Sequence, residues 1–231
     1  MHQNYIREQL KKQLKSDFYT PSGIHVFYKE PFHCDKVDLE TAVANLESVL
    51  PSYLLSEVEM IVVGWFKEFE ERSISAFYKD GALYISSFQD DNEELYKDLL
   101  HETSHSLEVS YGMAIYADEE VKNEFLRKRE HLYSIMWSKG FKTPKSVFMD
   151  IEYSEEFDKF LYKQVGYDKL SSLMMGLFIS PYAATSLSEY FATGFAEFYT
   201  NSDHKYLQKI GPSLYKKLIL LQSEEKLDNQ Y

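Results

Sequence analysis

Residues 74–86 read Ile-Ser-Ala-Phe-Tyr-Lys-Asp-Gly-Ala-Leu-Tyr-Ile-Ser, and this stretch decides the fold class together with the segment that follows it. Two short runs of β-branched and aromatic residues flank Asp80 and Gly81, a pair that supplies the positive φ angles of a tight turn. The stretch therefore predicts a β-hairpin. From Asn92 the apolar residues recur at helical spacing through Leu107, which predicts a helix soon after the hairpin.

The rest of the chain extends this pattern. Strands are predicted at residues 25–28 and 58–63; the second is a near-continuous apolar run, typical of a strand buried on both faces. The helical periodicity predicts further helices at residues 3–16, 39–50, 118–139, 154–180, 187–200 and 213–221. Because the sequence has no internal repeat and no linker rich in Gly, Ser or Pro, we expect one α+β domain over residues 1–231.

Charge and composition exclude several classes of protein. The chain carries 25 Lys and Arg against 37 Asp and Glu, a net charge of −12, whereas nucleic-acid binders usually present a basic face. We therefore expect no nucleic-acid partner. No apolar run reaches the roughly 18–20 residues of a membrane span, and we expect none. The single cysteine, Cys34, cannot form an internal disulfide. The first ten residues are polar and lack the apolar core of a signal peptide.

The predicted helix from Asn92 carries the sequence His101-Glu102-Thr103-Ser104-His105, an HExxH motif. Positions i and i+4 of a helix share one face, so the two imidazoles can offer nitrogens to one Zn²⁺. Glu102 is then placed to accept a proton from a water at the metal as that water attacks a carbonyl. The motif predicts one zinc ion per chain, with His101 and His105 as ligands and Glu102 as general base.

A hydrolytic zinc site needs a third protein ligand, and the spacing alone leaves it open. One class of zinc peptidases has a third His six residues after the motif; Tyr111 stands there, which excludes that class. Among carboxylates, Glu189 is the best candidate because it lies on a predicted helix with an apolar side, while Glu197, Glu119 and Glu108 compete with it.

Residues 182–195 resemble the metal-binding end of the lethal factor-like zinc metallopeptidases, the family that includes the clostridial Pro-Pro endopeptidases. That family has HExxH followed much later by a Tyr and, seven residues on, a Glu; Tyr182 and Glu189 have this spacing, and residues 201–204 and 211–215 also look like the family's C-terminal end. The resemblance implies a zincin-like fold, with a small mixed β-sheet, an active-site helix and additional C-terminal helices. It further implies Glu189 as third ligand and Tyr182 as a hydrogen-bond donor to the oxyanion.

Two features depart from the family. The family usually has a second Glu four residues after the glutamate ligand; four residues after Glu189, this chain has Thr193. His105 and Glu189 are 84 residues apart, more than in the family, so residues 118–180 are expected to be a helical insertion that covers or reshapes the cleft.

The leading hypothesis is thus a zinc-dependent endopeptidase acting on a peptide or protein that lies along an edge strand at residues 74–78. Trp65 and Phe66 could shape a neighbouring subsite, but we expect them to be buried aromatic residues. A non-catalytic binding module on the same scaffold and an intracellular regulatory protease that cuts one partner are the alternatives. The resemblance favours a toxin-related protein that is secreted or delivered to a target cell, although no signal peptide is visible in this sequence. The sequence leaves the oligomeric state open.

Overall fold

The computed structural model describes residues 17–223 and residue 227. The helix predicted at residues 3–16 lies outside the described residues. Contacts within the chain define two compact units, one ending at Ser110 and the other beginning at Tyr111, and each is described by itself. The single domain expected from the sequence stays a prediction.

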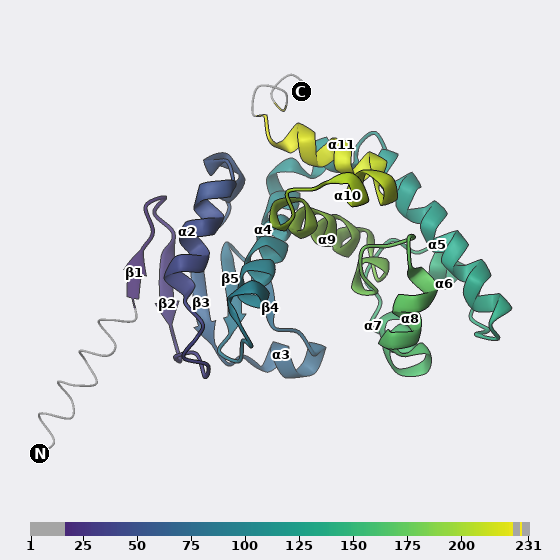
Figure 1. Cartoon of the computed structure of the whole chain (residues 1–231), viewed down its shortest axis with the longest axis horizontal. Helices are drawn as coiled ribbons and strands as arrows, with labels where there is room; N and C mark the ends of the chain where they lie inside the picture. The colour runs from purple at the N-terminus through teal and green to yellow at the C-terminus, as the bar shows by residue number, and fades with distance from the viewer. Residues whose placement is uncertain (1–16, 224–226, 228–231) are drawn as a thin grey trace, which may run out of the picture. The chain divides into compact units, whose positions relative to one another are not determined.

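The first unit contains a five-stranded mixed sheet (Figure 1). Its strands are β1 (Asp17–Tyr19), β2 (His25–Tyr28), β3 (Met60–Gly64), β4 (Ala76–Lys79) and β5 (Ala82–Ser86). Their order is β1-β2-β3-β5-β4, in which β2, β3 and β5 are parallel while β1 and β4 run antiparallel at the two edges. Helices accompany this sheet in the chain, so the α+β class and the small mixed sheet are confirmed.

The predicted hairpin is formed by β4 and β5. Asp80 and Gly81 take φ angles of 49° and 81°, the left-handed conformation that such a turn requires. Across the two strands Phe77 stacks on Tyr84 with ring centroids 4.6 Å apart, which fixes the pairing of the strands. The strand β4 lies at an edge of the sheet, as the sequence predicts.

The core of the sheet is the strand β3. Ile61 and Val63 are fully buried and Val62 is 8% exposed, which confirms burial on both faces. The helices of this unit are α2 (Leu39–Val49), the 3₁₀ turn η1 (Ser52–Leu55), α3 (Lys67–Arg72) and α4 (Asn92–Tyr116), the last of which continues past Ser110. The sequence did not predict β1 or α3.

The second unit is helical. Its elements are α5 (Glu120–Ser138), α6 (Lys145–Phe148), α7 (Glu155–Lys159), the π-helix η2 (Phe160–Val165), α8 (Tyr167–Met174), the 3₁₀ turn η3 (Tyr182–Ala184), α9 (Leu187–Thr200), α10 (Lys205–Ile210) and α11 (Pro212–Leu221). The prediction of one helical stretch over residues 154–180 was wrong. Gly166 takes a φ of 86° and separates η2 from α8, and the chain leaves the helical conformation again at Met175.

The helix α5 is the centre of this unit and packs against α9 and α11. Its buried Glu124 accepts hydrogen bonds from the Tyr190 hydroxyl at 2.8 Å and from the backbone N–H groups of Ser213 and Leu214 at 2.8 and 3.2 Å. Glu124 therefore satisfies the free N–H groups at the start of α11, where the helix dipole favours a negative charge.

Candidate metal centre

The helix α4 begins at a side-chain cap. Asp91 Oδ1 accepts hydrogen bonds from the backbone N–H groups of Glu93 and Glu94, each at 2.9 Å. Leu95, Leu99 and Leu107 are fully buried, so one side of the helix is fixed in the core. This burial determines which way the motif residues face.

The two middle residues of the motif lie on the buried side. Thr103 and Ser104 are fully buried, and each hydroxyl donates to a carbonyl of the preceding turn, Thr103 to Leu99 at 2.7 Å and Ser104 to His101 at 2.6 Å. Their polar atoms are therefore satisfied within the helix. His101 and His105 are half-buried, so both imidazoles remain partly accessible from solvent.

The structure brings the three predicted residues of the motif together. One ligand atom from each of His101, Glu102 and His105 lies within 4.8 Å of the others, and the two imidazole centroids are 5.1 Å apart. This group could hold a metal ion. Imidazole nitrogens and carboxylate oxygens are ligand types that several divalent metals, Zn²⁺ among them, accept.

Glu102 is fixed from the neighbouring edge strand. It is 8% exposed, and its Oε2 accepts a hydrogen bond of 2.8 Å from the backbone N–H of Tyr78 on β4. A main-chain donor at this distance stabilises the ionised carboxylate and holds its orientation. No sequence pattern indicated this contact, because the donor is a backbone group.

Two further carboxylates flank the histidines on α4. His105 Nδ1 lies 3.3 Å from Glu108 Oε1, and with a proton on Nδ1 the nitrogen that would bind a metal is Nε2. Glu108 was considered only as a competing third ligand, although its i+3 spacing from His105 pointed to this contact.

Asp98 is the second of these carboxylates, one turn before His101. Burial raises the pKa of Asp98 above its ordinary value, while hydrogen bonds with Ser75 and Gln89 and the charge of His101 oppose that rise. The Gln89 side-chain nitrogen donates to Asp98 at 3.0 Å. Asp98 was not among the predicted site residues, although its helical spacing to His101 was an available signal.

The two other predicted site residues lie in the helical unit and contact each other. The Tyr182 hydroxyl on η3 donates to Glu189 Oε1 on α9 at 3.2 Å. Glu189 is 7% exposed, and its backbone N–H donates to the capping hydroxyl of Ser186 at 3.1 Å. The seven-residue spacing thus brings a phenol and a carboxylate side by side within this unit.

Arg129 holds the turn that carries Tyr182. Its guanidinium, 1% exposed, donates to the carbonyls of Ala184 and Thr185 and, from its other nitrogens, to those of Val147 and Phe148. These carbonyls lie at or near the ends of η3 and α6, where helix dipoles favour a positive charge. Arg129 was not among the predicted residues, because its acceptors are backbone carbonyls and leave no side-chain pattern in the sequence.

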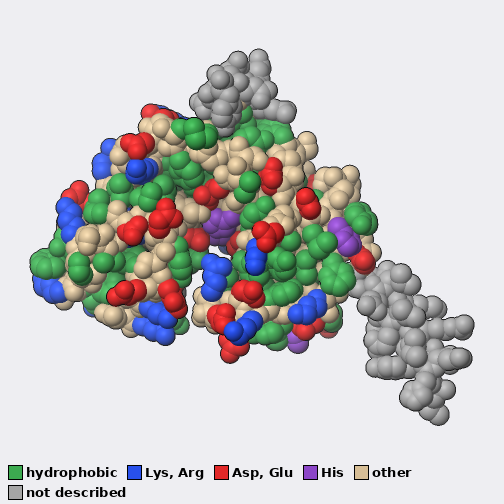
Figure 2. Space-filling model, turned by 180° about the vertical axis from the view of Figure 1, so that it is seen from behind, with side chains coloured by type: hydrophobic (Ala, Val, Ile, Leu, Met, Phe, Trp, Pro, Cys, Tyr) green, Lys and Arg blue, Asp and Glu red, His purple; other side chains and the backbone are tan. Residues whose placement is uncertain are grey.

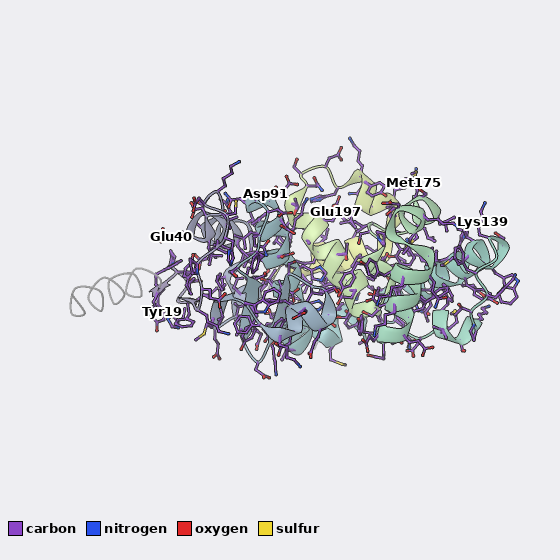
Figure 3. All side chains as sticks on the ribbon, turned by 90° about the horizontal axis from the view of Figure 1, so that it is seen from below. Tyr19, Glu40, Asp91, Lys139, Met175 and Glu197 are labelled. Carbon is purple, nitrogen blue, oxygen red and sulfur yellow. The ribbon has the colours of Figure 1, made fainter. Side chains whose placement is uncertain are left out.

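The competing carboxylates have other surroundings. Glu119 is exposed before α5 and forms an ion pair with Lys122 at 2.8 Å. Glu197 is half-buried on α9 (Figure 3). On the face seen in Figure 2, acidic side chains are interspersed with basic ones, and the described residues there form no broad basic area.

Comparison with known proteins gives no match to a family model, to a curated protein or to a solved structure. Within the described part of the chain, none of the helices has both the length and the apolar character that crossing a membrane requires.

Proposed function

We propose that the chain is a zinc-dependent endopeptidase of the zincin type, with His101, His105 and Glu189 as metal ligands. The observation that carries the proposal is the group His101, Glu102 and His105, whose ligand atoms lie within 4.8 Å of one another on α4. The assignment of Glu189 rests on its spacing from Tyr182 and on the family resemblance.

The bound zinc would act as a Lewis acid and would make a water molecule acidic enough to lose its proton near neutral pH. Glu102 is the group that accepts this proton and later delivers it to the leaving amine. The Tyr78 N–H supports that role because it keeps the carboxylate in one orientation.

Tyr182 supplies the hydrogen bond to the oxyanion. Its single proton is donated to Glu189 at 3.2 Å in the structure, so the hydroxyl would turn from that carboxylate to the oxyanion during the reaction. A donor aimed at an oxyanion commonly contributes about 3 kcal/mol to the stabilisation of the transition state.

The substrate is a peptide or protein segment in extended conformation. The strand β4 is at the edge of its sheet, and the Tyr78 N–H points away from β5, toward Glu102. An extended segment could add to this edge through main-chain hydrogen bonds.

The proposal is tested with a diverse peptide library incubated with zinc-loaded protein, in which new termini are identified by mass spectrometry. Glu102→Gln is the control, since its amide oxygen can still accept from the Tyr78 N–H but cannot act as a base. We expect cleavage only with Glu102 present. Zinc binding at one ion per chain without any cleavage would favour the non-catalytic binding module instead.

A further inference from the structure

A second candidate site lies in the first unit, at the carboxyl ends of its parallel strands. A pocket of about 530 Å³ is lined by Glu30, His33, Trp65 and Phe88. Glu30 follows β2, Trp65 follows β3 and Phe88 follows β5. Loops beyond the carboxyl ends of parallel strands are the usual place for ligand sites in such sheets. This pocket contains none of the residues assigned above to zinc chemistry.

Main-chain hydrogen bonds fix the walls of the pocket. The His33 N–H donates to the Ser87 carbonyl at 2.9 Å, and the Ser87 N–H donates to the Gly64 carbonyl at 3.1 Å. A Cβ at Gly64 would lie 2.9 Å from the Cβ of Lys29, so the close approach of these segments requires glycine. The loops are therefore preorganised before any ligand arrives.

Three rings form two walls at a right angle. His33 stacks on Phe88 with centroids 3.9 Å apart and an interplanar angle of 12°. Trp65 meets Phe88 edge to face, at 5.7 Å and 85°. Trp65 is 39% and Phe88 56% exposed, so the prediction that Trp65 is buried was wrong. Both side chains are thus partly exposed, and the face of an aromatic ring carries negative electrostatic potential that attracts a cation.

The lining of the pocket carries an acidic side chain, that of Glu30, and no Lys or Arg. Lys29, the neighbour of Glu30, is not a lining residue; its ammonium lies 4.5 Å above the ring of Phe66 and donates to the Trp65 carbonyl at 3.0 Å. A chain of net charge −12 adds a long-range attraction for positive ligands.

We propose that this pocket binds a quaternary ammonium cation. Such a group has no N–H donors, so a lining of rings with a single carboxylate satisfies it completely, whereas a guanidinium would bring five donors to few acceptors. The inference goes beyond the proposed peptidase and holds whether or not the chain cleaves peptides.

The test uses the Trp65 fluorescence as the reporter. The chain has two tryptophans, so Trp137→Phe leaves Trp65 as the only one. At pH 8 we expect choline to change the Trp65 emission and to bind about tenfold more tightly than its uncharged isostere 3,3-dimethylbutan-1-ol. Equal binding of the two would overturn the proposal, because shape alone would then explain it.

Variants separate this site from non-specific attraction. Glu30→Gln and Phe88→Leu should each weaken choline binding about two- to fivefold, whereas Glu40→Gln, on the exposed surface of α2 (Figure 3), should leave it unchanged. An equal loss with Glu40→Gln would contradict a defined site. Circular dichroism verifies that each variant is folded, and saturation-transfer NMR on the choline methyl protons repeats the test with unmodified protein.

Two further ligands identify the source of the cation. Free choline and a peptide that contains trimethyl-lysine carry the same charged group. Tighter binding of the peptide would indicate a polypeptide as the natural ligand, and tighter binding of choline a small molecule. Either result supports the proposal. An arginine peptide that binds more tightly than both would overturn the assignment to quaternary ammonium.

Discussion

The backbone N–H of Tyr78 donates a hydrogen bond of 2.8 Å to the carboxylate of Glu102. One residue belongs to the edge strand β4 and the other to the HExxH motif on α4. The bond therefore connects the strand proposed to receive a substrate with the group proposed to move the proton.

Tyr78→Pro removes this donor and keeps the edge strand, where a missing outward N–H is tolerated. We expect kcat to fall at least about tenfold relative to Tyr78→Ala, which keeps the N–H, because hydrogen bonds to charged groups are worth about 1.5–3 kcal/mol. Zinc content should be unchanged in both variants. Equal kcat values for the Pro and Ala variants would show that this bond does not support Glu102.

Glu108→Gln tests whether the carboxylate beside His105 supports metal binding. The contact of 3.3 Å with Nδ1 should orient the imidazole, so the variant should bind zinc about 10- to 100-fold more weakly. Competition with a chromophoric chelator measures this affinity. Glu70→Gln, at an exposed position of α3, is the matched control and should bind zinc normally; an unchanged affinity in Glu108→Gln would contradict the orienting role.

Tyr182→Phe removes only the hydroxyl that contacts Glu189. If Tyr182 donates to the oxyanion, its loss should lower kcat by about 100-fold with little change in KM. The hydrogen bond to the oxyanion forms only in the transition state, so substrate binding does not depend on it. Steady-state kinetics on a peptide from the library separates these two effects. Tyr206→Phe, on an exposed tyrosine of α10, should behave as wild type; a change confined to KM in Tyr182→Phe would assign the residue to substrate binding.

Lys128 makes the stability of the protein depend on pH. Burial lowers the pKa of Lys128 to about 8, partly opposed by the charge of Glu124 and reinforced by that of Arg127, while the ammonium donates to the carbonyls of Leu177 and Ile210. Between about pH 8 and 10.5 the unfolded chain binds a proton at this lysine that the folded chain does not. The contribution of Lys128 to the free energy of unfolding therefore rises with pH in that range.

Urea denaturation checks this effect. From pH 8 to 9.5 the wild type should gain about 1.5 kcal/mol relative to Lys128→Met. Lys139→Met, at the exposed end of α5 (Figure 3), should follow the wild-type curve. Parallel curves for wild type and Lys128→Met would mean that the buried ammonium titrates as it does in the unfolded chain.

The sequence was sufficient for features that depend on local patterns. Asp80-Gly81 determined the hairpin, and the apolar spacing after Asn92 determined the helix that presents His101 and His105. The family resemblance drew attention to Tyr182 and Glu189, which contact each other, while the roles predicted for them stay predictions.

Contacts between distant segments could not be predicted in this way. The bond from Tyr78 to Glu102 has a main-chain donor, and Arg129 binds carbonyls far along the chain, so neither leaves a side-chain pattern. Trp65 was predicted to be buried because large aromatic residues usually are, yet it lines an open pocket. The helical periodicity of residues 154–180 concealed the break at Gly166.

The most direct test of the central claim compares wild type and Glu102→Gln at equal zinc content. The rate of cleavage of one library-selected peptide is measured for each, before and after chelation and with zinc restored. We predict that the wild-type rate disappears on chelation and returns with zinc, and that the variant is at least about 1,000-fold slower although it binds the metal equally. A variant that retains the wild-type rate, or a rate that survives complete removal of zinc, would contradict the account.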